Sequence, residues 1–182
     1  MEKKTSTNVA IKWAVIYVVT SIIITYIFQF FNINQSSPAK YVSYLPFIIF
    51  LLLAQKEYQA QLGGFIKFGD SFLAGFLYSV FGGIMLAIFI YLYLGILSPQ
   101  VLDQAMESQR QAFADKGLSS DQIEQSMEMG KKYGAIFGAV GTLFAIPILG
   151  AIVALIGASI FKKEKAIDFT EQDSSSYSDP TI

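Results

Sequence analysis

Residues 72–97 read FLAGFLYSVFGGIMLAIFIYLYLGIL and contain no charged side chain over 26 positions. A helix needs about 20 consecutive apolar residues to cross the ~30 Å hydrocarbon core of a bilayer. Two further uncharged runs, residues 13–31 and 133–161, are 19 and 29 residues long. Together these runs predict that the 182-residue chain is an integral membrane protein.

The composition supports this interpretation and excludes several functions. Hydrophobic residues make up 53% of the chain and charged residues 15%, whereas soluble domains carry about 25% charged residues. The net charge of -1 gives no electrostatic reason to expect nucleic acid as a partner. The chain has neither Cys nor His, which excludes disulfides, thiolate metal sites and the commonest metal ligand. We therefore expect no cofactor and no enzymatic activity.

The expected fold is all-α: an integral membrane four-helix bundle with an extramembrane amphipathic helical hairpin between the third and fourth spans. Residues 1–165 form the membrane domain, with spans at about 12–31, 38–55, 71–97 and 133–161 and the hairpin at about 99–132. Residues 166–182 are predicted to be a disordered cytoplasmic tail, because Ser, Asp and Glu dominate there. The second span is the shortest, and a re-entrant segment is the alternative. Its expected start is Ser37-Pro38, as N-cap and first helical residue.

The hairpin is predicted from a change in pattern after the third span. Apolar residues fall on one helical face, among them Val101, Leu102, Ala105, Met106, Ala112 and Phe113. Gly117 suits a helix C-cap, and Ser119 with Gln122 forms a capping box. We therefore expect two short helices, about 99–116 and 120–132. They either lie on the membrane surface or pack on the ends of the long spans. The acidic polar face favours packing, because it attracts anionic lipid poorly.

The distribution of Lys and Arg predicts the orientation. Eight of these residues flank the N-terminus, the connection between the second and third spans, and the C-terminal end of the fourth span. Five lie on the opposite side. Because cytoplasmic loops carry the excess of positive charge, both termini are predicted to be cytoplasmic and the hairpin extracytoplasmic. A helical protein with this bias is expected in the inner (plasma) membrane, as a multi-pass protein in contact with membrane lipid.

Small residues recur every four positions in two of the runs, so each set lines one helical face. They are Gly75, Ser79, Gly83 and Ala87 in the third span and Gly134, Gly138, Gly150, Ala154 and Ala158 in the fourth. In lipid, small residues let helix backbones approach closely, and this contact drives helix association. We interpret them as helix-packing residues within one chain. A contact between identical chains is the alternative.

The function that these features favour is a structural or accessory membrane component. The spans carry no charged residue in their interior, whereas proton and ion pathways usually contain one. The hairpin is the expected contact surface for a protein partner. The alternative is a small-molecule transporter or channel, acting alone or as an oligomer, and self-association is possible in either case.

Two stretches resemble a known family. One comprises Glu57-Tyr58, residues 63–72 (GGFIKFGDSF) and Gly75-Phe76; the other is residues 117–125 (GLSSDQIEQ), which follow a proline and a Gln/Glu-rich helix. Over about residues 8–165 the chain is similar to the bacterial membrane family called domain of unknown function 4199. The resemblance implies a four-span layout, mostly in Gram-negative bacteria. It implies no established activity, catalytic residue or cofactor.

Overall fold

The computed structural model describes residues 5–31, 41–42 and 44–164. The regular structure in this part is helical, in the order α1 (Ser6–Phe30), α2 (Tyr44–Gln61), α3 (Phe68–Leu92), the π-helical turn η2 (Tyr93–Leu97), α4 (Pro99–Asp115) and α5 (Ser120–Phe161). The all-α prediction is confirmed for these residues. The expected tail at 166–182 and the Ser37-Pro38 cap lie outside them.

Three of the described helices are long and apolar enough to cross a membrane. They are α1, the continuous segment Phe68–Leu97 formed by α3 and η2, and α5. The helix that contains the third predicted span, 71–97, begins three residues earlier, at Phe68. The helix that contains the first, 12–31, begins six residues earlier, because α1 continues through polar residues back to Ser6.

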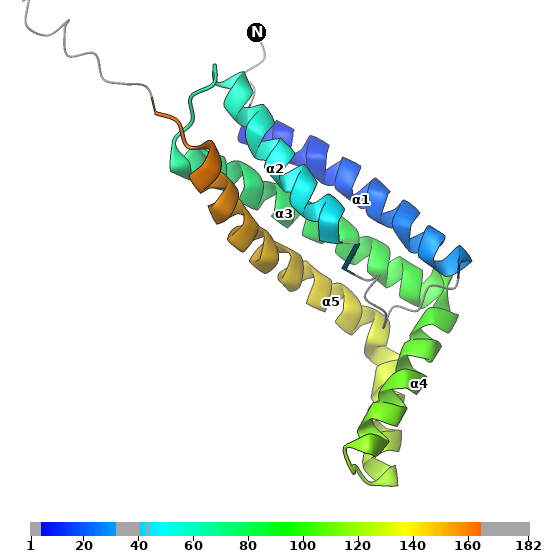
Figure 1. Cartoon of the computed structure of the whole chain (residues 1–182). Helices are drawn as coiled ribbons and strands as arrows, with labels where there is room; N and C mark the ends of the chain where they lie inside the picture. The colour runs from blue at the N-terminus through cyan, green and yellow to red at the C-terminus, as the bar shows by residue number, and fades with distance from the viewer. Residues whose placement is uncertain (1–4, 32–40, 43, 165–182) are drawn as a thin grey trace, which may run out of the picture.

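Helices α1, α2, α3 and α5 lie side by side as a bundle (Figure 1). The most extensive helix pair is α3 with α5, followed by α1 with α3. An aromatic cluster fills the centre: the Phe47 ring of α2 lies 5.3 Å from the Tyr17 ring of α1 and 5.6 Å from the Tyr78 ring of α3. The Tyr78 hydroxyl donates a hydrogen bond to the carbonyl oxygen of Phe47 at 3.1 Å, which satisfies this fully buried polar group.

Contacts between helix ends fix the direction of each helix. Lys12, in the first half of α1, pairs with Glu57 near the end of α2. The connection from α2 to α3 forms an antiparallel bridge through Ile66 to Lys163, just beyond α5. Consequently α1 and α3 run one way, α2 and α5 run the other way, and the beginning of α1 lies at the same end of the bundle as the end of α5 (Figure 1).

The second helix continues beyond the predicted span of 38–55, because α2 runs from Tyr44 to Gln61. Residues 38–40 and 43 lie outside the described part of the chain. Hydrogen bonds to neighbouring helices explain the extension, because Gln55, Glu57 and Gln59 all find partners inside the bundle. Polar residues that appear to end a membrane helix can thus continue it when other helices supply acceptors and donors.

The predicted second helix of the hairpin, about 120–132, is not a separate element. A single helix, α5, runs for 42 residues from Ser120 to Phe161 and contains Pro147. The change from amphipathic to apolar sequence at Tyr133 marks a change of surroundings and not a break in the backbone. The predicted turn is confirmed: Gly117 has a φ of 77°. The capping box is confirmed as well, because Ser119 and Gln122 exchange both of its hydrogen bonds.

Helix α4 and the first part of α5 extend beyond the other helices (Figure 1). We call this pair, residues 99–134, the arm. Within it α4 packs antiparallel to α5, with Met106 against Gly130 and Leu102 against Gly134. A side chain at either glycine would collide with its partner, since a Cβ at Gly134 would lie 2.8 Å from Leu102 Cδ1. The two helices of the arm therefore approach closely.

Candidate functional site

The predicted packing residues of α3 face α5 in the first half of the helix. A Cβ added to Gly75 would lie 2.9 Å from Ala154 Cβ, and one added to Gly150 would overlap Ser79. Gly83 is equally close to its neighbour, with a distance of 3.1 Å from an added Cβ to Pro147 Cδ. The structure thus brings two residues of each predicted set together.

The remaining predicted packing residues lie elsewhere on the same helix pair. Gly138 of α5 faces Ile90 and Leu94 at the end of α3, where a Cβ would lie 3.4 and 3.2 Å from their side chains. Gly134 faces α4 in the arm and not α3. Ala87 and Ala158 are buried.

The most concentrated set of polar contacts between helices lies in the last turns of α2. The side chains involved are Gln55, Glu57 and Gln59, and we call them the α2 polar cluster. They reach every other helix of the bundle: Glu57 contacts α1, Gln55 contacts α3 and α5, and Gln59 contacts the end of α5. The sequence places Gln55 at the end of the second predicted span and the other two residues in the connection that follows, and it does not indicate these contacts.

Gln55 is the buried member of the α2 polar cluster, with no exposed surface. Its amide nitrogen donates to the carbonyl oxygens of Ser71 and Ala154, at 3.0 and 2.9 Å. Because both acceptors are backbone atoms of other helices, one side chain ties α2 to α3 and α5. These two bonds also fix the orientation of the amide, whose oxygen Oε1 is buried without a hydrogen-bond partner among the described residues.

Two glycines form the walls of the slot that holds this amide. A Cβ on Gly75 of α3 would lie 2.9 Å from Gln55 Nε2, and a Cβ on Gly157 of α5 would overlap Gln55 Oε1. Gly75 therefore serves both helix packing and the glutamine. The signal available in the sequence was a glutamine one residue beyond an uncharged run, which alone does not identify its partners.

Glu57 connects α2 to α1. Its carboxylate accepts hydrogen bonds from Lys12, from the Trp13 indole at 2.8 Å and from Gln61 at 3.0 Å. The Lys12 ammonium, the Trp13 indole and the Gln61 amide thus all direct a donor at one carboxylate. Glu57 therefore links α2 to α1 through an ion pair and a hydrogen bond.

Gln59 completes the cluster at the end of α5. Its amide nitrogen donates at 2.8 Å to the carbonyl oxygen of Phe161, the last residue of α5. That carbonyl is one of the groups at a helix C-terminus that has no partner within the helix. Gln59 therefore caps α5 from a neighbouring helix, next to the Ile66–Lys163 bridge.

A second polar contact lies at the opposite end of the bundle, where the arm begins. The Gln29 amide of α1 donates to Ser98 Oγ and accepts from the Tyr93 hydroxyl, both at 3.2 Å. Tyr93 and Ser98 bracket the π-helical turn and are each only 3% exposed. These bonds connect α1 to the root of the arm.

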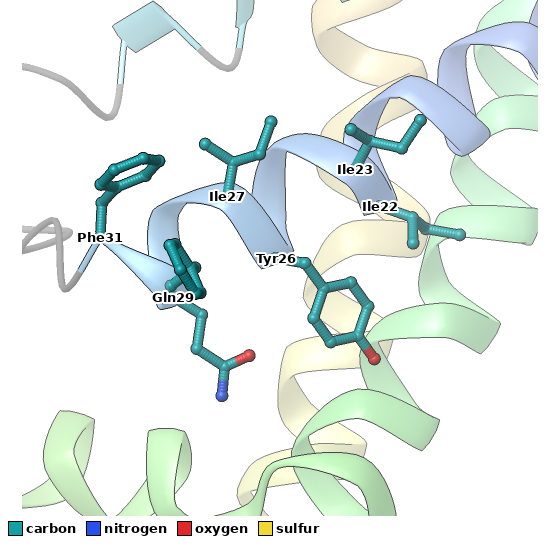
Figure 2. Close-up of a pocket in the computed structure, with 7 residues that line it drawn as sticks. Ile22, Ile23, Tyr26, Ile27, Gln29 and Phe31 are labelled. Atoms are coloured by element: carbon teal, nitrogen blue, oxygen red, sulfur yellow. The ribbon is translucent and has the colours of Figure 1, made fainter.

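Figure 2 shows a hollow of about 620 Å³ beside the last turns of α1. Its described lining comprises Ile22, Ile23, Tyr26, Ile27, Gln29, Phe30 and Phe31. The described wall is almost entirely apolar, and its polar groups are the Gln29 amide and the Tyr26 hydroxyl. The described part of this wall carries no charged side chain.

The described residues contain no arrangement typical of a metal site or a catalytic centre. Within residues 5–31, 41–42 and 44–164, no three Asp or Glu side chains gather closely enough to hold a metal ion. The buried polar side chains in this part are Gln55, Ser71, Ser79 and Ser98, which carry no charge. The polar contacts described above join helices and contain no pairing of a nucleophile with a base.

Several long, closely packed apolar helices, joined by a few polar contacts, define a helical membrane protein. Residues 12–163 match the family described as protein of unknown function, DUF4199, and the chain belongs to that family. Searches of curated proteins and of solved structures gave no match.

Proposed function

We propose that the protein is a structural or accessory component of the membrane that presents its arm to a protein partner and has no catalytic activity of its own. The observation that carries this proposal is the contrast between the two parts of the molecule. Aromatic and small side chains fill the interior of the bundle. The arm, in contrast, projects from the bundle (Figure 1) and exposes a polar surface.

The proposal includes four membrane crossings. Because α1 and α3 run in the same direction, the chain must return across the bundle between them, and α2 is the described helix that does so. Its 18 residues span about 27 Å at 1.5 Å per residue, close to the ~30 Å hydrocarbon core. The α2 polar cluster lowers the hydropathy of α2. However, the amide nitrogens of Gln55 and Gln59 donate to backbone carbonyls of α3 and α5, and such bonds make these residues more tolerable at that depth.

The proposed location is the inner (plasma) membrane, with both termini in the cytoplasm. An even number of crossings supports this, since the beginning of α1 and the end of α5 lie at the same end of the bundle (Figure 1). Positive residues at that end include Lys12, Lys56, Lys67 and Lys163. Under the positive-inside rule this end faces the cytoplasm, and the arm faces outward.

The arm is suited to water and to a protein surface. Its apolar side chains pack against each other, as Met106 and Leu102 do against the glycines of α5, and Ile123 is buried. No residue of α4 is fully buried, and its outer face carries Asp103, Glu107, Arg110 and Asp115. Because the two helices bury each other's apolar faces, contact with lipid would stabilise them little. Contact with a protein is therefore the role that we propose for the exposed face.

Photo-crosslinking in living cells tests the proposal. A photoreactive amino acid is placed at Gln104 or Gln111, which are exposed on α4, and in matched controls at Phe144 or Ile152, which are exposed on the membrane part of α5. We expect both arm positions to give the same protein adduct and the controls to give none. The proposal would be contradicted if the arm positions gave no adduct, or if the purified protein carried a solute across liposome membranes.

A further inference from the structure

Two neighbouring segments connect the arm to the bundle, and both bend more easily than a regular α-helix. The first is η2, a turn with the wider i→i+5 hydrogen bonding that is rare in helices and often found at functional sites. The second is the stretch of α5 beside it, which contains Gly134, Gly138 and Gly141. A glycine inside a helix makes that stretch less stable than alanine would.

Contacts place these two segments next to each other. A Cβ on Gly138 would lie 3.2 Å from Leu94 of η2, and a Cβ on Gly95 of η2 would lie 3.7 Å from Ala135. Helix α4 itself makes its main contacts with α5 and η2. The described contacts therefore leave α4 without extensive support from α1, α2 or α3.

Gln29 provides the link from α1 to this joint. Its amide bonds Tyr93, the first residue of η2, and Ser98, the residue that follows η2. The Ser98 N–H closes the turn by donating to the Tyr93 carbonyl oxygen at 2.8 Å. The Tyr93 ring also packs edge-on against Tyr26 of α1, with 6.0 Å between ring centroids. One amide of α1 thus holds both ends of the π-helical turn.

We propose that the arm is hinged at η2 and the glycine-containing stretch of α5, and that Gln29 is a positioning residue that latches the hinge. Releasing the two Gln29 hydrogen bonds lets the arm change its angle to the bundle, so the last turns of α1 and the arm are mechanically coupled. One part of this inference rests on the proposed function, namely that the orientation of the arm regulates partner binding. The hinge and the latch are properties of the chain alone.

The test measures distances between spin labels in the full chain, purified and placed in lipid nanodiscs without a partner. The chain has no native Cys, so labels at Gln111→Cys in the arm and Ile88→Cys in α3 report one distance. We expect a single narrow distribution in the otherwise unchanged protein. In Gln29→Leu we expect a broader distribution or a second peak. Tyr93→Phe removes one hydrogen bond but keeps the ring, and a smaller broadening is expected.

Thr25→Val is the matched control, because the Thr25 hydroxyl bonds only the Ser21 carbonyl oxygen of its own helix among the described contacts. Its distance distribution should match that of the unchanged protein. Identical distributions in Gln29→Leu and Tyr93→Phe would overturn the latch, and so would equal broadening in Thr25→Val. If Gln29→Leu fails to fold, Tyr93→Phe alone decides. Because no partner is present, this result is independent of the crosslinking test of the proposed function.

Discussion

Replacing Gly157 by Ala tests whether the buried glutamine of α2 holds the bundle together. The added Cβ would overlap Gln55 Oε1 and lie 2.8 Å from Leu52 Cδ2. The amide must then leave its slot, and its hydrogen bonds to Ser71 and Ala154 are lost. We therefore expect one methyl group on α5 to destabilise the contacts of α2 with two other helices.

The magnitude follows from three effects. Overpacking of a close contact costs about 1–3 kcal/mol. Each hydrogen bond between membrane helices contributes about 0.6 kcal/mol on average and up to ~1.7 kcal/mol. Alanine favours the helix over glycine by about 0.8–1 kcal/mol, which opposes the other two effects. We expect a net loss of about 1–5 kcal/mol in the free energy of unfolding.

The assay is reversible unfolding in mixed micelles by titration with sodium dodecyl sulfate, followed by circular dichroism. The control is Gly141→Ala, where an added Cβ meets nothing within 4 Å, so helix propensity should leave the protein equally or more stable. In a Gln55→Ala background the clash with the amide is absent and only the 2.8 Å approach to Leu52 Cδ2 remains, so Gly157→Ala should cost clearly less than in the unchanged protein. The reasoning is refuted if Gly157→Ala is as stable as the unchanged protein, or if its cost is the same in both backgrounds.

Two further predictions concern other contacts of the bundle. Gly83→Leu should sharply lower the yield and melting temperature of folded protein, because even a Cβ there would lie 3.1 Å from Pro147 Cδ. Gly141→Leu is the control and should melt like the unchanged protein. An unchanged melting curve for Gly83→Leu would rule out close packing at that point. Glu57→Gln should lower the free energy of unfolding, because the amide keeps the size of the side chain but loses the charge that pairs with Lys12. Titration with sodium dodecyl sulfate measures this loss, and equal stability of Glu57→Gln and the unchanged protein would show that the ion pair contributes nothing to the contact between α1 and α2.

The sequence predicted those elements that are marked by a run of neighbouring residues. Uncharged runs identified the long helices, since only a membrane interior favours them. Local chemistry predicted the turn at Gly117 and the capping box at Ser119, because both depend on residues within a few positions. At Tyr133 the sequence changes from amphipathic to apolar, and this change predicted the end of a short helix. In the structure α5 continues through this residue.

What the sequence could not predict are contacts between residues far apart along the chain. Gln55 binds a carbonyl group 99 positions away and Gln59 one that is 102 positions away, and no local pattern records either pairing. Polar residues beyond an uncharged run predict a loop when their partners are unknown. For the same reason the sequence did not reveal the second role of Gly75. Because glycine has no side chain, this position leaves room for the Gln55 amide as well as for α5.

The central claim is that the arm and the α2–α3 connection lie on opposite sides of the membrane, with the arm outside. Because the chain has no native Cys, single cysteines at Gln111 and Leu62 can be tested with a membrane-impermeant thiol reagent on cells whose inner membrane is intact. We predict that Gln111→Cys reacts in such cells, and that Leu62→Cys reacts only after the membrane is permeabilised. Equal labelling at both positions, or labelling at Leu62→Cys alone, would contradict the claim.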